Sequence, residues 1–441
     1  MTESSNVVSP SQFKIDGVFL TNYSGVELNI SYVGATINIY EDMLADCLSG
    51  EIIINDANNL IANFPIVGQE KLRISYQTLA KSGKSSQISL EFYIYGIERS
   101  DKSTESRNEV YTLHFCSKEA ILNTRKRISK ALSGDPTELI GDILQQDFGL
   151  QSGKMYRYVK SKFIENVVIP YWTPFQAINW LQKRAIPENY SGASFMFYET
   201  TRGFRCEPLE AMYERKSVKA FYYSPHNFFP EEGRRDYQYE ATKIDRFSRS
   251  PHFDSLSDLS GGKYSSHLIT HDIFTKKITF TEFNLIDKYE EFKHCEGDTG
   301  KTGQKLKIPV SIKPDENKKR ISDYPVSKIE FYPTHDKIFN SDDAPDTRSK
   351  PEDWVSQRTS MLAQLDGISI TIGVPGDSEL RVGQMVDVFI PSDENLEKAD
   401  DKYDKILSGK YLITSIAHTM SRAGYDMIIR LNKDSIRNPL P

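Results

Sequence analysis

The chain has 441 residues, of which 38% are apolar and 26% are charged, so it is long enough for two to four domains with buried cores. Its net charge of −6 argues against a basic groove that grips nucleic acid through phosphate contacts. The four cysteines, at positions 47, 116, 206 and 295, form no CxxC pair, which favours free thiols in a reducing compartment. No apolar run approaches the roughly 18 residues of a membrane span, and Met1–Pro10 lacks a signal-peptide pattern. We therefore expect a protein made in the cytoplasm, without stable membrane insertion.

Strands are expected to dominate the first quarter of the chain. After a polar arm, apolar and polar residues alternate in short runs, which is typical of half-buried strands. Residues 1–116 are therefore predicted to form a first β domain. Its expected strands are Val18–Leu20, Val26–Val33, Ala35–Tyr40, Gly50–Ile54, Leu72–Tyr76, Leu90–Ile97 and Val110–Phe115.

Helical periodicity takes over after Ser117, and residues 117–236 are predicted to form a helical, mixed α+β middle domain. Two helix starts are well marked, because Asp135 and Thr173 each precede a proline at the first helical position. The expected helices are Ala120–Leu132, Thr137–Phe148 and Pro174–Ala185, and the expected strands are Ala193–Glu199 and Phe204–Pro208.

The last part of the chain is predicted to be β-rich again, with strands at Ala241–Phe247, His267–Phe274 and Lys277–Phe283. Residues 284–364 are read as a charged insert, because turn residues and charges dominate them. Within this insert, Val326–Tyr332 is a candidate strand and Trp354–Gln364 a candidate helix. The second β domain is then discontinuous and consists of residues 237–283 and 365–441.

A similar pattern occurs near both ends of the chain. In each copy a glycine opens a strand (Gly50–Ile54, Gly367–Ile372), and a Val-Gly-Gln triplet then leads into a second strand. The triplets are 315 positions apart (383 minus 68) and the opening glycines 317 (367 minus 50). Two more strands follow in each copy, at Tyr411–Ile416 and Tyr425–Leu431 in the second. This order favours an internal duplication, with coincidental β patterning as the alternative.

No motif indicates an enzyme. His267 and His271 are four residues apart, but on a strand this spacing separates the two rings by about 13 Å, and no third ligand follows. His294 and Cys295 lie in an acidic stretch, and we expect them at the surface. Gly297–Thr302 lacks the first glycine of a phosphate loop. Paired carboxylates are abundant but lie in polar runs. We therefore expect no catalytic residue, no cofactor and no metal.

Two further segments complete a resemblance. The segment Phe163–Phe175 contains an Ile-Pro-Tyr-Trp-Thr step that enters a helix, and the turn at Phe253–Tyr264 precedes the strand that begins at His267. In order with the doubled β unit, they resemble the central baseplate hub protein of T-even-type contractile-tailed phages. More widely, they resemble the hubs of contractile injection machines. The likeness covers roughly residues 15–435.

This resemblance implies a β-rich α+β fold with two tube-type β-barrel domains, the middle domain and the insert. Hubs of this family form a homotrimeric ring whose six similar units give pseudo-sixfold symmetry. The charged insert departs from the T-even pattern and leaves the outer contacts undefined. The candidate barrel or interface residues are Val67, Gly68, Gln69 and Ile74 in the first copy, and Val382, Gly383, Gln384 and Val388 in the second.

The resemblance also implies partners and a location. The ring would join a trimeric spike protein to the hexameric tail tube or a tube-initiator protein, and would contact the tape measure and baseplate wedge proteins. DNA would cross its channel without sequence-specific binding, in a virion baseplate assembled in the host cytoplasm. Because the chain ends soon after Leu431, a separate spike protein is expected. The alternatives are a hub of a related injection apparatus, a cell-wall hydrolase with two opposed carboxylates, or a carbohydrate-binding module, which the 11% aromatic content favours.

Overall fold

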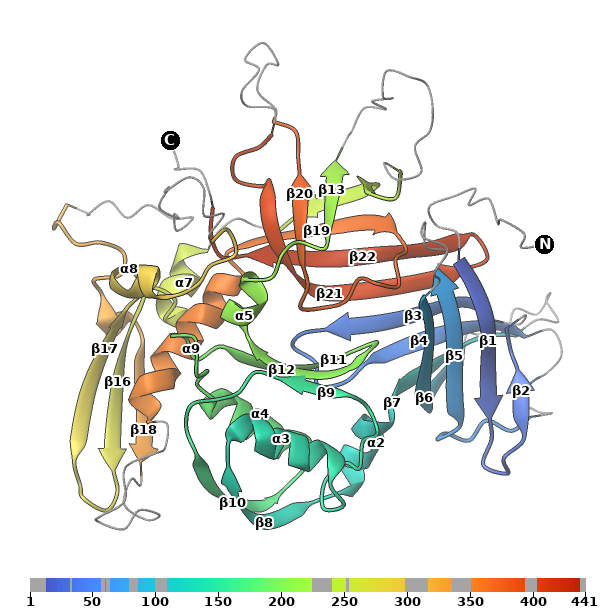
Figure 1. Ribbon diagram of the computed structural model, residues 1–441, viewed down its shortest axis with the longest axis horizontal. Coiled ribbons are helices and arrows are strands. Elements are labelled where there is room, and N and C mark those ends of the chain that lie inside the picture. Colours follow the sequence, from blue (N-terminus) through green and yellow to red (C-terminus); the bar gives the residue numbers. More distant parts are fainter. Residues whose placement is uncertain are drawn as a thin grey trace.

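The structure is a computed structural model of the full chain (Figure 1). It has a large sheet at the top and right of the figure, a mixed α/β region below, and a small sheet with a long helix at the left. The residues described are 13–31, 34–56, 60, 64–78, 86–99, 109–223, 240–250, 254–297, 316–334, 350–392 and 403–436.

Seven strands form the N-terminal part of the large sheet. They are β1 (Phe13–Thr21), β2 (Glu27–Asn29), β3 (Gly34–Asp42), β4 (Ser49–Asp56), β5 (Lys71–Thr78), β6 (Ser86–Arg99) and β7 (Glu109–Ser117). Their order is β2-β1-β5-β6-β7-β4-β3, and every neighbouring pair is antiparallel. Strand β5 illustrates the cause, since Leu72, Ile74 and Tyr76 alternate into the core, each 0% exposed.

The C-terminal part of the sheet repeats this arrangement. Its strands are β19 (Ile368–Pro375), β20 (Met385–Phe389), β21 (Gly409–Ser421) and β22 (Gly424–Lys433). They pair antiparallel in the order β19-β22-β21-β20, which corresponds to β4-β7-β6-β5. A bulge recurs as well, between Ile94 and Gly96 in β6 and between Ile413 and Ser415 in β21. The two four-stranded units thus share strand order, direction and bulge position.

The two units join into one 14-stranded sheet, because β21 pairs antiparallel with β3 over Ser415–Ser421. One hydrophobic core cluster spans both units. The remaining strands of the sheet are β13 (Lys219–Tyr223), β14 (Lys243–Ile244) and β15 (Arg246–Arg249). The β-rich α+β class is confirmed. The two tube-type barrels, however, do not close: among the described strands, the pairings form an open arrangement that branches at β21, which pairs with β20, β22 and β3.

The middle region contains two small sheets, β8-β10 and β11-β12-β9, packed with helices. Asp135 caps α3 by accepting a bond from the Thr137 N–H at 2.7 Å, and Thr173 forms a capping box with Gln176 at the start of α4. Both helices therefore begin as the sequence predicts. The elements are α2 (Lys118–Arg125), β8 (Ile128–Gly134), α3 (Pro136–Gln145), β9 (Tyr156–Tyr158), β10 (Glu165–Trp172), α4 (Pro174–Arg184), β11 (Phe195–Thr200), β12 (Gly203–Pro208) and α5 (Leu209–Tyr213).

The helix predicted over Ala120–Leu132 is wrong in its second half. Helix α2 ends at Arg125, Lys126 has an extended backbone (φ −106°, ψ 146°), and the chain continues as strand β8. Strand β8 pairs with β10, and Ile128 is buried in the core of the middle region. Backbone pairing and burial override the helical periodicity here, because intrinsic propensity is only a weak preference.

The third region is the small sheet β17-β16-β18, with helix α9 packed against β16. Strands β16 and β17 therefore lie outside the sheet of the second β unit, where the sequence had placed them. They pair instead with β18, which belongs to the charged insert. The bounds are α7 (Ser255–Gly261), β16 (Ser265–Asp272), β17 (Ile278–Asn284), α8 (Leu285–Lys288), η1 (Tyr289–Glu291), η2 (Pro325–Ser327), β18 (Ile329–Thr334) and α9 (Pro351–Leu365).

Candidate assembly interface

The two Val-Gly-Gln segments form matching loops, but one residue out of step. In the first loop, the Gln69 N–H donates to the Ile94 carbonyl at 2.8 Å; in the second, the Gly383 N–H donates to the Ile413 carbonyl at 2.9 Å. Both donors have left-handed backbones, with φ of 76° for Gln69 and 83° for Gly383. Gly383 therefore matches Gln69, an offset of 314 (383 minus 69) rather than the 315 of the sequence triplets.

The strands beside these loops show which other positions correspond. Ile74 lies opposite Leu90 of β6, and Val388 lies opposite Gly409 of β21. Leu90 lies four positions before Ile94, where the β6 bulge begins, and Gly409 lies four positions before Ile413, where the β21 bulge begins. Ile74 and Val388 are thus equivalent, and both are 0% exposed. The opening glycines are not equivalent. Gly50 pairs with Phe115 of β7, whose counterpart in β22 is Leu431. The residue that pairs with Leu431 is Ile370, not Gly367.

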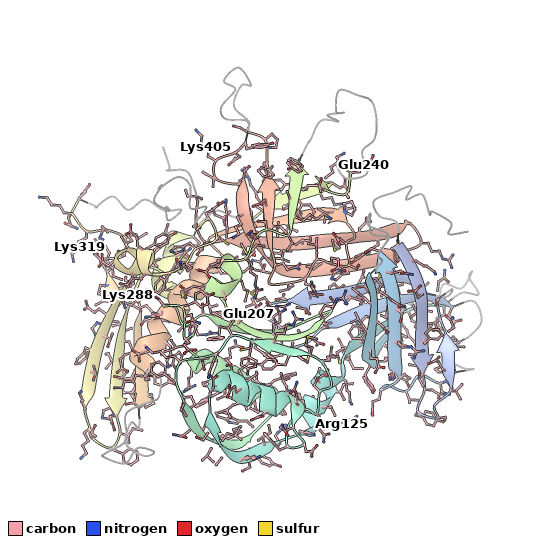
Figure 2. All side chains as sticks on the ribbon, in the orientation of Figure 1. Arg125, Glu207, Glu240, Lys288, Lys319 and Lys405 are labelled. Atoms are coloured by element: carbon pink, nitrogen blue, oxygen red, sulfur yellow. The ribbon has the colours of Figure 1, made fainter. Side chains whose placement is uncertain are left out.

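The two loops have opposite surroundings. In the first, Val67 is 70% exposed, and Gln69 accepts a bond from Arg125 (2.8 Å), which lies near the lower edge of the molecule in Figure 2. In the second, Val382 is 1% exposed, and a Cβ on Gly383 would lie 2.0 Å from the Tyr198 hydroxyl oxygen. The middle region covers the second loop, whereas the first remains an accessible surface.

Glu41 connects three regions of the molecule, although nothing in the sequence marks it. Its side chain, 0% exposed on β3, accepts bonds from the Thr201 N–H in the middle region and the Val382 N–H in the second unit, each at 3.1 Å. The His418 Nε2 atom of β21 lies 3.7 Å away. A charged residue on a strand is normally read as solvent-facing, so only the tertiary contacts reveal this role.

The junction between β21 and β3 leaves two matching edges open. In the second unit, β3 runs along Ser415–Ser421 beyond the end of β20. Counting from the bulge, the corresponding part of β6 is Gly96–Arg99, which pairs with β7 but has no partner beyond β5 among the described strands. The counterpart of β3 is β15, since β15 pairs with β19 as β3 pairs with β4. Within the described residues, the other edge of β15 is unpaired too.

Comparison with known proteins identifies the fold. No family model matches the sequence, and no curated protein matches it. The structure is similar to the tail protein from Neisseria meningitidis MC58, with a TM-score of 0.52, 13% identity and 96% of each chain covered. It is also similar to the 43 kDa tail protein of prophage MuSo2 from Shewanella oneidensis, with a TM-score of 0.52, 11% identity, and 94% of this chain and 97% of that chain covered.

The chain has the fold of these tail proteins. At such low identities the likeness extends to the fold alone. A component of the type VI secretion system from E. coli scores lower, with a TM-score of 0.41 and 10% identity, over 97% of this chain and 78% of that chain.

His294 and Cys295 are buried, contrary to the surface position predicted from the sequence. They are 4% and 0% exposed, and the His294 ring nitrogens contact Asp434 Oδ2 and the Tyr289 carbonyl, each at 2.8 Å. Burial lowers the pKa of His294, but the Asp434 carboxylate and these hydrogen bonds raise it to above its ordinary value. The acidic stretch thus folds back onto the end of the second unit and provides no nucleophile–base pair at the surface.

The described residues show little else that indicates chemistry. His, Cys, Asp and Glu side chains of the described segments form no group of three that could hold a metal ion. His267 and His271 lie on β16, and His267 is 3.5 Å from Glu282. No helix in the described part of the chain is long and apolar enough to cross a membrane. Of the segment Gly297–Thr302, only Gly297 belongs to the described residues.

A pocket of about 400 Å³ lies between the first β unit and the middle region. The Lys154 ammonium reaches into it and pairs with Glu119 at 2.7 Å and Glu199 at 2.6 Å. Burial raises the pKa of Glu199 above its ordinary value. Burial also tends to raise the pKa of Glu119, but the positive charge and hydrogen bond of Lys154 outweigh it and lower the pKa of Glu119 below its ordinary value. The two side chains are only 3% and 1% exposed. These two ion pairs join the segment that contains Lys154 to α2 and β11.

Proposed function

We propose that the chain is the structural hub of a contractile phage tail, in which three copies close into a ring of six similar β units. The observation that carries the proposal is the junction between β21 and β3. It joins two units of the same strand order, and it leaves the corresponding edges on β6 and β15 without partners among the described strands. The shared fold of the two tail proteins supports the same role.

Repeating that junction between copies would build the ring. Strand β15 of one copy would lie along β6 of the next, as β3 lies along β21 within the chain. Such a head-to-tail contact gives a closed ring when the rotation between copies closes, and closure protects strand edges that would otherwise promote aggregation. We expect a permanent interface of this kind to bury over about 2,000 Å².

The ring would adapt threefold to sixfold symmetry. Three copies match a trimeric spike protein, and six β units match a hexameric tail tube or tube-initiator protein. The tape measure and baseplate wedge proteins are the further proposed partners, and the proposed location is the virion baseplate, assembled in the host cytoplasm. The net charge of −6 suits a channel that DNA crosses without being held. A related contractile injection apparatus would use the same architecture with a different spike.

The experiment is a measurement of oligomer mass by analytical ultracentrifugation, with an edge-blocking variant. The Ser250 N–H bonds to the Ser369 carbonyl on β19, so by the alternation of an antiparallel pair the Arg249 N–H points to the open edge. Arg249→Pro removes that donor without breaking the pairing with β19, whereas Arg249→Ala removes the same side chain and keeps the donor.

We expect trimers for the wild-type chain and for Arg249→Ala, and smaller species for Arg249→Pro. The ring hypothesis fails if the wild-type chain stays monomeric at all concentrations, with or without the spike. If Arg249→Pro forms the same ring as the wild-type chain, the proposed pairing of β15 with β6 between copies is wrong.

A further inference from the structure

Strand β6 has a second open edge, at its beginning. Strand β7 pairs with β6 only from Phe92 onward, so Ser86–Glu91 has β5 on one side and no described strand on the other. Backbone groups alternate between the two sides of a strand in an antiparallel sheet. Because the Ile94 N–H bonds to the Glu70 carbonyl beside β5, the backbone groups of Ser89 and Glu91 point to the open side.

The pocket of about 400 Å³ lies against this edge, and Ser89, Glu91, Ser117 and Thr201 are among the residues that line it. The side-chain oxygens of Ser117 and Thr201 are buried without a hydrogen-bond partner, and the two residues are 0% and 8% exposed. A buried hydroxyl group without a partner is unfavourable. The pocket therefore combines a strand edge that has no partner among the described strands with two buried hydroxyl oxygens that lack a hydrogen-bond partner.

The second β unit shows what covers the corresponding edge. Lys410 corresponds to Glu91, because Lys410 lies three positions before Ile413 and Glu91 lies three positions before Ile94, the residues at which the two bulges begin. The Lys410 N–H donates to the Glu296 carboxylate at 2.9 Å, and the Cys295 N–H donates to Asp434 at 2.9 Å. A short segment, His294–Glu296, thus covers this edge and places a carboxylate against its backbone.

Among the residues that the structure describes, no such cover is present in the first unit. The loop Ser152–Lys154 approaches from the middle region, but its side chains bond to Glu119 of α2. Glu119 accepts bonds from the Ser152 hydroxyl at 2.6 Å and from Lys154 at 2.7 Å. Within the described residues, no hydrogen bond joins this loop to the backbone of Glu91. A Cβ added to Gly153, which lines the pocket, would meet no atom within 4 Å. The pocket is therefore open at Gly153.

We propose that this pocket binds a short peptide segment of another protein, with a carboxylate side chain where Glu296 lies in the second unit. The carboxylate accepts from the Glu91 N–H and the Ser117 hydroxyl. The charged residues that line the pocket are Lys118, Lys154 and Arg202 together with Glu91, Glu119 and Glu199. Two donors, with Lys118 also lining the pocket, favour an acidic side chain. A second copy does not fit, because its corresponding segment is buried in place, with Cys295 0% exposed. This site is independent of the ring, since it uses the opposite edge of β6.

The test uses the full chain and a labelled synthetic peptide that copies Phe292–Gly297, with fluorescence anisotropy as the measurement. Gly153→Trp fills the pocket; Gly261→Trp is the matched control, because its Cβ also meets no atom within 4 Å and it lies on α7, away from the pocket. We expect the wild-type chain and Gly261→Trp to bind equally. Gly153→Trp, or a peptide carrying Glu296→Ala, should weaken binding at least about tenfold, which corresponds to about 1.4 kcal/mol.

Amide hydrogen exchange gives a second readout. Bound peptide should slow exchange at Glu91 and Ser89 in the wild-type chain and leave Gly153→Trp unchanged. The proposal is overturned if the peptide fails to bind at millimolar concentration, binds Gly153→Trp equally well, or binds without its carboxylate. It is also overturned if Gly153→Trp abolishes self-association, because the occupant would then be a second copy.

Discussion

Replacement of Glu41 by alanine tests whether this buried carboxylate holds the two β units and the middle region together. The side chain accepts the Thr201 and Val382 N–H groups, each at 3.1 Å. Each hydrogen bond to a charged group contributes about 1.5–3 kcal/mol, and each buried N–H left without a partner costs about 1–3 kcal/mol. Removal of a buried charge offsets part of this loss. We expect Glu41→Ala to reduce the free energy of unfolding by about 2–4 kcal/mol.

Urea unfolding measures the total effect, and amide exchange at Thr201 and Val382 locates it. Glu41→Gln keeps one acceptor oxygen and should lose about half as much, roughly 1–2 kcal/mol. The control is Glu379→Ala. Glu379 pairs with Arg202 at 3.5 Å, but its side chain is 56% exposed, and such surface pairs contribute at most about 1 kcal/mol.

Two results would refute this reasoning. One is a loss for Glu41→Ala no larger than that for the Glu379→Ala control. The other is unchanged exchange protection at both amides, which would mean that the buried carboxylate does not hold these loops.

Three further predictions concern the repeated units and the buried histidine. Asp at Ile74 or Val388 places a charge at a position 0% exposed and should cost about 4 kcal/mol or more, so that the protein aggregates on expression; soluble variants that form rings would contradict the assigned core faces. Gly383→Ala should cost about 2 kcal/mol or more in thermal unfolding, because φ is 83° and the Cβ meets Tyr198, whereas Gln69→Gly at the matching position should be neutral or stabilising. The pKa of His294 is raised above the ordinary 6.5, so its contribution to stability is full below about pH 6.5 and disappears as pH rises through the raised value. Asp434→Asn should flatten that dependence in unfolding measured across this range, and an unchanged slope would show that another group causes it.

Local patterns predicted the elements whose formation depends on neighbours in sequence. The alternation in Leu72–Tyr76 and Val386–Val388 indicated strands with one buried face, as the structure has them. Asp135 and Thr173 marked two helix starts, because capping involves residues only two or three positions apart. At Ile128 the same kind of reasoning failed, since that residue lies in a strand paired with β10, far along the chain.

Length, composition and alternation by themselves determined a β-rich chain with a similar four-stranded unit near each end. The tertiary structure decided which strands pair: β21 with β3, β16 with β18, and Gln69 rather than Gly68 in the position of Gly383. It also decided the burial of Glu41 and His294. The physical reason is that a strand's alternation fixes which side chains turn inward but not which strand lies beside it. That choice depends on contacts between residues hundreds of positions apart, and so do the edges that remain open for a partner.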